Sequence, residues 1–191
     1  PLIYAAAIES GEFTAATTVL DSPVVFLDNE GGDWIPENYE GDYSGFVRLR
    51  KALALSVNVV SIRISQQLGI EHIMKYLAKL LKFDGTEAKE RIPRNFSIAL
   101  GSMEVSPFEL TRAYSIIANG GKDVIPFAIR YVKDREGKIL ENREEEVQKI
   151  LADEEKDGDI QVIKPETAQM LSSMMQSVIT SGTGSAASPG R

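Results

Sequence analysis

Apolar residues recur through much of this chain at the three- and four-residue spacing that gathers them on one face of an α-helix. The spacing predicts four helices in the first half of the chain, at residues 2–10, 47–55, 59–68 and 70–83. Gly11 and Gly69 directly follow two of these runs, at the position where glycine commonly ends a helix. We therefore expect the first half to be mainly helical.

Two more helices are predicted in the second half from residues that mark helix ends. Ser106, Pro107 and Glu109 form a capping box, in which the serine accepts a bond from a backbone amide and the glutamate reaches back. This helix should end at residues 120–121, which are both glycine. A last helix is expected over about 165–180, because a proline stands at its start.

A β-hairpin is predicted by the alternation of apolar and polar residues in 127–143, with its turn at 134–137. The loop that follows the first helix is rich in glycine, proline, aspartate and asparagine, and it contains one strand-like run at 23–27. Residues 144–160 are strongly acidic and lack the Asp-x-Asp-x-Asp-Gly spacing of a calcium-binding EF-hand. We expect this segment to be a solvated charged linker.

The composition is that of a folded protein and excludes several kinds of chemistry. Of the 191 residues, 43% are hydrophobic and 26% are charged, which is ordinary for a globular domain. The net charge of −7 argues against nucleic acid as the main partner, because phosphate binding requires a basic surface. The sequence has no cysteine, which excludes disulfides, thiol catalysis and cysteine–zinc sites, and we expect neither a metal nor a cofactor.

Two further absences narrow the candidate chemistry. No apolar run reaches the ~18 residues needed to cross a bilayer, so we expect no membrane segment in this chain. The single histidine, His72, lies in an amphipathic helical run and is predicted to be a solvated surface residue. Acid–base chemistry must therefore rely on other groups.

Ser56 and Asn58 are polar residues within the largely apolar run ALALSVNVVSIRI, residues 52–64. If buried without partners, each would destabilise the fold by roughly 1–3 kcal/mol. One hypothesis is that they cap the helix that follows, since serine and asparagine are preferred at that position. The other is that Ser-x-Asn is part of a functional site, and the tripeptide alone does not decide between them.

The surrounding residues resemble the transpeptidase domain of class A penicillin-binding proteins, the bifunctional peptidoglycan synthases. In that family a Trp-x-Pro-x-Asn-Tyr-(Asp/Glu)-Gly segment leads through Leu-Arg-x-Ala-Leu-Ala-x-Ser-x-Asn into a helix. The matching residues here are Trp34, Pro36, Asn38, Tyr39, Glu40, Gly41, Leu49, Arg50, Ala52, Leu53, Ala54, Ser56 and Asn58. The likeness continues in residues 98–140 and 164–187, so it covers nearly the whole chain.

The resemblance implies three catalytic elements, of which the chain contains one. Such enzymes use Ser-x-x-Lys with the nucleophile, Ser-x-Asn, and Lys-Thr/Ser-Gly. Only the second is present, as Ser56 and Asn58, while Pro1 looks like the proline that commonly follows the first. We expect the third to follow shortly after Arg191, and the 191 residues alone to be inactive. Residues 182–184, Gly-Thr-Gly, do not form a phosphate loop, because no Lys-Ser/Thr follows them.

The resemblance also implies roles for individual residues. Ser56 would relay a proton towards the departing D-alanine amine, and Asn58 would hold the lysine and the substrate amide. Trp34 is expected either to anchor its loop by packing or to line the cleft and contact substrate. The implied partners are peptidoglycan stem peptides and β-lactams, at the extracytoplasmic face of a bacterial membrane. The parent would normally carry a membrane helix and a glycosyltransferase domain outside this segment.

For the fold, the resemblance implies the helical part of the α/β serine transpeptidase fold. Residues 1–191 would be one partial domain, mainly helical, with one hairpin and a few short strands. The sheet of the complete domain would cover an apolar face of this segment, so we expect that face to drive homo-oligomer formation. Two other functions stay open: a D,D-carboxypeptidase or serine β-lactamase relative, from whose Ser-Asp-Asn motif Val57 departs, and a non-catalytic helical scaffold module.

Overall fold

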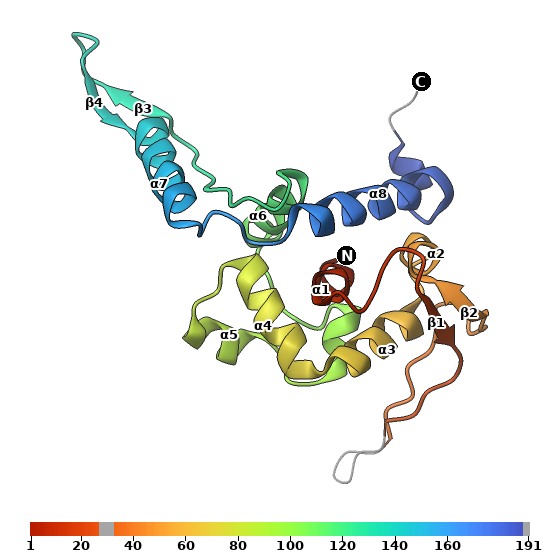
Figure 1. Cartoon of the computed structure of the whole chain (residues 1–191). Coiled ribbons are helices and arrows are strands. Elements are labelled where there is room, and N and C mark those ends of the chain that lie inside the picture. The colour runs from red at the N-terminus through yellow and green to blue at the C-terminus, as the bar shows by residue number, and fades with distance from the viewer. Residues whose placement is uncertain (27–32, 189–191) are drawn as a thin grey trace.

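The computed structural model describes residues 1–26 and 33–188, and it is built mainly from helices packed around a central one (Figure 1). The α-helices are α1 (Leu2–Ser10), α2 (Leu49–Ala54), α3 (Asn58–Leu68), α4 (Ile70–Leu81), α5 (Gly85–Arg91), α6 (Pro107–Ala118), α7 (Arg143–Asp157) and α8 (Pro165–Ser181). Short 3₁₀ helices lie at Phe96–Leu100 (η1) and Ser185–Ala187 (η2). The strands are β1 (Thr18–Asp21), β2 (Gly45–Arg48), β3 (Tyr131–Lys133) and β4 (Ile139–Asn142).

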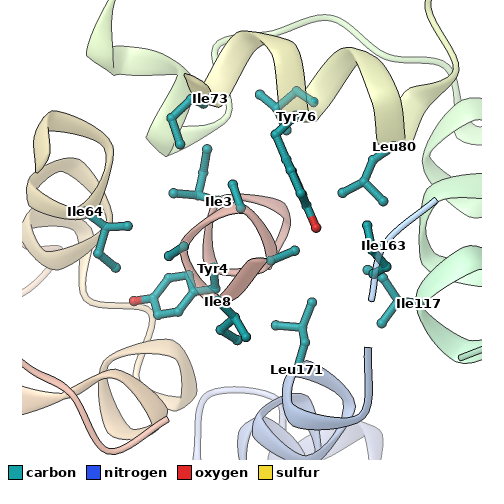
Figure 2. Close-up of a cluster of buried hydrophobic side chains, with 14 of the residues drawn as sticks. Ile3, Tyr4, Ile8, Ile64, Ile73, Tyr76, Leu80, Ile117, Ile163 and Leu171 are labelled. Carbon is teal, nitrogen blue, oxygen red and sulfur yellow. The ribbon is translucent and has the colours of Figure 1, made fainter. Parts of the chain in front are cut away.

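Helix α1 is the centre of the core. Its residues 3–8 are all buried, because α3, α4 and α8 pack around it. Figure 2 shows Ile64, Ile73 and Leu171, from those three helices, directed at α1 from different sides. A helix that is apolar on every side is stable only when it is surrounded in this way. The predicted helix 2–10 and its end at Gly11, in the left-handed conformation at φ 83°, are confirmed.

Strands β1 and β2 form an antiparallel pair, with Leu20 opposite Phe46 and Asp21 opposite Gly45. The strand predicted at 23–27 is wrong for residues 23–26, because the strand in this region, β1, lies earlier in the chain. Residue 27 lies outside the described residues. The helix predicted from residue 47 begins at Leu49, because the two residues before it continue β2. Strand β2 thus leads directly into α2.

The hairpin predicted in 127–143 is confirmed as the antiparallel pair β3–β4, with an irregularity between Val132 and Lys133. The capping box is confirmed too: Ser106 accepts from the Glu109 amide at 3.2 Å, and Glu109 accepts from the Ser106 amide at 2.7 Å. The last helix covers Pro165–Ser181, close to the predicted 165–180. These elements are the ones that the sequence marks most clearly at their ends.

The prediction that 144–160 is a charged linker is wrong, because most of this segment is helix α7. Asn142 caps the helix by accepting from the Glu145 amide at 3.2 Å. Ion pairs one turn apart, such as Lys149–Glu145 at 3.0 Å, lie along it, and Val147 is buried at 4% exposure. Helix α7 and the hairpin extend together away from the helices around α1 (Figure 1).

Candidate functional site

Ser56 ends helix α2 in a position that glycine usually occupies. Its φ is 55°, in the left-handed region. The Ser56 amide donates to the Leu53 carbonyl at 3.1 Å, and the Val57 amide donates to the Ala52 carbonyl at 2.9 Å. This pair of bonds is a Schellman motif, in which the left-handed residue is most often glycine. A serine in this conformation carries about 1–2 kcal/mol of backbone strain. Its presence in place of glycine indicates that the serine side chain has a role.

The hypothesis that Ser56 caps the following helix is therefore wrong. The N-cap of α3 is Val57, which makes no side-chain capping bond. The exposed Ser56 hydroxyl instead lies 3.2 Å from the Thr183 hydroxyl. The left-handed backbone of Ser56 directs its side chain away from the end of α2 and towards Thr183.

Asn58 is the first residue of α3, and its amide group has a fixed orientation. Nδ2 donates to the Glu37 carbonyl at 3.1 Å. A carbonyl can accept but not donate, so this contact identifies the nitrogen side of the amide. Among the described residues, Asn58 Oδ1 accepts no hydrogen bond. It is therefore available as an acceptor for a ligand or a neighbouring catalytic group.

Asn38, in the loop between β1 and β2, caps α3 from outside the helix. Its Oδ1 accepts from the Val59 amide at 3.2 Å, while its Nδ2 donates to Asp21 Oδ1 at 2.8 Å and to the Asp42 carbonyl at 2.9 Å. Asp21 is only 1% exposed and also accepts from the Ser44 amide at 2.8 Å. We call Asp21, Asn38, Asp42 and Ser44 the loop clamp, which fixes the start of α3 through the Val59 amide.

The segment after α8 docks against the same helix end. The Thr183 amide donates to the Ala54 carbonyl at 3.0 Å. A Cβ atom on Gly182 would lie 2.1 Å from the Ala54 oxygen, so only glycine permits this approach. No local sequence signal places Gly182 and Thr183 here; both lie near the end of the stretch that resembles the family.

Ser56 and Asn58 both line a pocket of about 470 Å³. Its other polar side chains are Ser61 and two tyrosines, Tyr4 and Tyr114. Its apolar wall is built by α1, α2, α4, η1, α6 and the segment between η1 and α6, through Leu2, Ile3, Leu53, Leu77, Ile98, Leu100, Met103, Val105 and Leu110. The volume, and the few polar groups among mostly apolar ones, are those of a typical small-ligand site.

Tyr4 is a polar group of this pocket that sequence reasoning missed. Burial raises the pKa of its hydroxyl from 10.0 to about 12, with the Ser61 hydroxyl acting in the opposite direction. The hydroxyl has no hydrogen-bond partner among the described residues. Figure 2 shows the Tyr4 ring on the side of α1 that faces Ile64 of α3. Because it stays protonated well above neutral pH, Tyr4 can act as a hydrogen-bond donor.

Trp34 is not among the residues that line the pocket. It is half-buried and packs on Phe26, with ring centroids 5.1 Å apart, and the two backbones exchange hydrogen bonds of 2.9 Å. Phe26 in turn packs on Phe96 at 5.5 Å. The structure thus shows the loop-anchoring role, and a contact between Trp34 and substrate stays a prediction. His72 is exposed, as predicted.

Within residues 1–26 and 33–188, no group of three or more histidine or acidic side chains is arranged to hold a metal ion. In the same ranges no helix is long and apolar enough to cross a membrane. The side chains singled out above carry hydroxyl and amide groups, which can both donate and accept hydrogen bonds.

Comparison with known proteins identifies the family. The sequence profile described as the penicillin binding protein transpeptidase domain matches residues 1–191. The chain belongs to this family. Penicillin-binding protein 1A of Pseudomonas aeruginosa is 43% identical over 141 residues, which are 73% of this chain and 16% of that protein. Penicillin-binding protein 1A of Neisseria meningitidis is 35% identical over 185 residues, covering 96% of this chain and 22% of that protein.

The fold of the chain agrees with this family assignment. The crystal structure of penicillin-binding protein 1A from Haemophilus influenzae superposes with a TM-score of 0.68 at 33% identity, over 74% of this chain and 20% of that one. The predicted fold class, the mainly helical part of a serine transpeptidase domain, is thereby confirmed. The chain spans about a fifth of the length of these relatives.

Proposed function

We propose that this chain is part of a peptidoglycan D,D-transpeptidase, which cross-links stem peptides through a serine acyl-enzyme. The observation that carries the proposal is the placement of Ser56 and Asn58 side by side in one pocket, at the family's second motif. Each is fixed by a different part of the chain, Ser56 by Thr183 and Asn58 by Glu37. Fixed hydroxyl and amide groups are what acyl transfer requires beside its nucleophile.

The reaction would proceed in two steps, acylation of the serine and transfer of the acyl group to a second stem peptide. The nucleophilic serine of a Ser-x-x-Lys element adds to the carbonyl before the terminal D-alanine, and the C–N bond breaks as the leaving amine takes a proton. An amine of a second stem peptide then attacks the ester, which releases the serine and forms the cross-link. Ser56 would pass the proton to the leaving amine, because its hydroxyl can accept and donate at once. Its contact with Thr183 limits the directions in which that hydroxyl can point.

Asn58 would position both the lysine and the peptide. With Nδ2 bound to Glu37, its Oδ1 is the acceptor that a lysine ammonium or a substrate N–H can use. The second hydrogen on Nδ2 can donate to a substrate carbonyl. The loop clamp would then act indirectly, by keeping this amide from rotating.

The proposed setting is the extracytoplasmic face of a bacterial membrane, with the parent protein anchored outside this segment. The proposed partners are stem peptides, with β-lactams as acylating mimics, which the name of the family supports. Self-association through exposed apolar residues stays a prediction.

The test uses the full-length protein that contains this chain and a fluorescent penicillin. Ser56→Ala and Asn58→Ala should each lower the acylation rate by roughly 10²-fold or more, as removal of a proton-transfer or positioning group does. Ser115→Ala, a half-buried serine on α6, should leave the rate unchanged. The 191 residues alone should not be labelled. Absence of labelling in the full-length protein would instead support the non-catalytic scaffold, and rapid release of the label a β-lactamase or carboxypeptidase.

A further inference from the structure

A second hollow, of about 640 Å³, lies where β2, α2 and α8 meet. We call it the basic groove. Its lining includes Phe46, Arg48, Arg50, Lys51, Leu55 and Ser177. Leu55 directly precedes Ser56, so the groove begins beside the candidate catalytic motif.

The charge of this groove is opposite to that of the whole chain. Arg48, Arg50 and Lys51 line it, and no acidic side chain does. Among the described residues none of the three forms an ion pair, whereas Arg91 is paired with Glu109 and other cations are paired elsewhere. In a chain of net charge −7, three unpaired cations in one hollow create a local positive potential that attracts anions.

Arg50 is held in place by neutral groups. Its Nη1 donates to the Ser173 carbonyl at 2.7 Å, to the Ser173 hydroxyl at 3.1 Å and to the Ser177 hydroxyl at 3.1 Å. These bonds fix the guanidinium without neutralising it. A fixed guanidinium binds a planar oxyanion with less loss of side-chain entropy than a freely moving one.

The groove also has an apolar rim. Phe46 is 76% exposed and Leu55 is 44% exposed. Exposed apolar side chains that adjoin unpaired cations can contact the apolar part of a ligand whose anionic group the cations hold. The combination fits a ligand that carries an oxyanion and an apolar portion, which excludes a simple inorganic ion as the best fit.

We propose that the basic groove binds a carboxylate-bearing peptide, whose carboxylate lies among Arg48, Arg50 and Lys51 and whose chain runs towards Ser56. The choice of a peptide rests on the proposed function, since a domain that joins stem peptides must hold two of them. Binding of inorganic phosphate by charge alone is the competing outcome, which the experiment distinguishes. The volume accommodates a few residues of peptide.

The binding test uses the 191-residue chain labelled with ¹⁵N and titrated with three probes at low salt. These are acetyl-Ala-Glu-Ala-amide, its glutamine counterpart acetyl-Ala-Gln-Ala-amide, and inorganic phosphate. We expect the glutamate peptide to shift the amide signals of Phe46 and Leu55 and to bind at least tenfold more tightly than the glutamine peptide. Equal binding of the two peptides, or tighter binding of phosphate than of either, would overturn the proposal.

Variants test whether binding depends on the cations of this groove or only on the overall charge of the chain. The double variant Arg48→Ala with Lys51→Ala should weaken glutamate-peptide binding at least tenfold, while Lys75→Ala with Lys79→Ala, exposed on α4, should not. Equal weakening in both would show that only overall charge matters, and the groove would be rejected. Arg50→Lys keeps the charge and should weaken binding less than the first pair. Acylation by penicillin is measured separately, so this proposal can fail while the proposed function stands.

Discussion

The hydroxyl of Ser56 lies 3.2 Å from the hydroxyl of Thr183, a residue 127 positions further along the chain. The contact joins the end of α2 to the segment after α8. It gives Ser56, strained at φ 55°, a defined partner. Ser56 and Asn58 are therefore held by three separate stretches of sequence: their own helix junction, the loop before β2 and the segment after α8.

Gly182→Ala should separate Thr183 from Ser56. The added methyl would lie 2.1 Å from the Ala54 oxygen, so the segment after α8 must move away. We expect a lower melting temperature and, in the full-length protein, a lower acylation rate. Gly85→Ala is the control, because its Cβ would meet no atom within 4 Å. If Gly182→Ala behaved like the control, the docking of this segment would not matter to the site.

Ser56→Gly should stabilise the chain and inactivate the site together. Glycine adopts the left-handed conformation without strain, so the free energy of unfolding should rise by about 1 kcal/mol relative to Ser56→Ala. Alanine keeps the strain and loses the same hydroxyl, which makes it the matched comparison. Denaturant unfolding measures the difference. A glycine variant less stable than the alanine variant would contradict the observed conformation.

Asn38→Asp should break the loop clamp in a pH-dependent way. It places a second carboxylate where Nδ2 now donates at 2.8 Å to the buried Asp21. At pH 7 we expect a loss of about 2 kcal/mol or more, from the lost charged hydrogen bond and the repulsion. The loss should shrink as the pH falls from 7 towards about 4, because repulsion raises the pKa of one carboxyl of the folded pair and the protonated carboxyl can donate to the other. Asn38→Ala lacks the carboxylate and should show no such recovery.

Protonation of Glu109 should lower the stability of the chain in acid. Its hydrogen bonds with Arg91, at 2.7 and 2.9 Å, and with the Ser106 amide lower its pKa from 4.5 to about 2. A carboxylate with a lowered pKa contributes stability that is complete above the unfolded value and is lost as the pH falls. The melting temperature should therefore decline between pH 4.5 and 2. Glu109→Gln should start lower and decline less steeply; an unchanged slope would assign the acid sensitivity to other carboxyls.

Much of the fold was predictable because local signals agree with tertiary packing. Helix α1 is apolar throughout and stops at a glycine, and α6 begins with a capping box. Helix α7 was not predicted, because its sequence has few apolar positions. Its helical form depends on the Asn142 cap and on ion pairs one turn apart, which an acidic composition conceals.

The site was predictable only in part. Ser56 and Asn58 stand two residues apart and match a motif, so sequence reasoning found them. Their partners Thr183 and Asn38 are distant in sequence, and nothing short of the folded chain brings them to the same helix junction. The choice of Ser56 as an N-cap failed because local preference for serine at helix starts was outweighed by the end of the preceding helix.

The central position of α1 also restricts how the specificity of the pocket can change. Leu2, Ile3 and Tyr4 form part of its wall, and the next three residues are alanines with 0% exposure. Any larger side chain at those alanines would overpack the core, so this wall has little freedom to vary without unfolding the chain. Variation that alters which ligand fits the pocket should therefore be tolerated better at Leu100 and Leu110, which also line it and are 43% and 38% exposed.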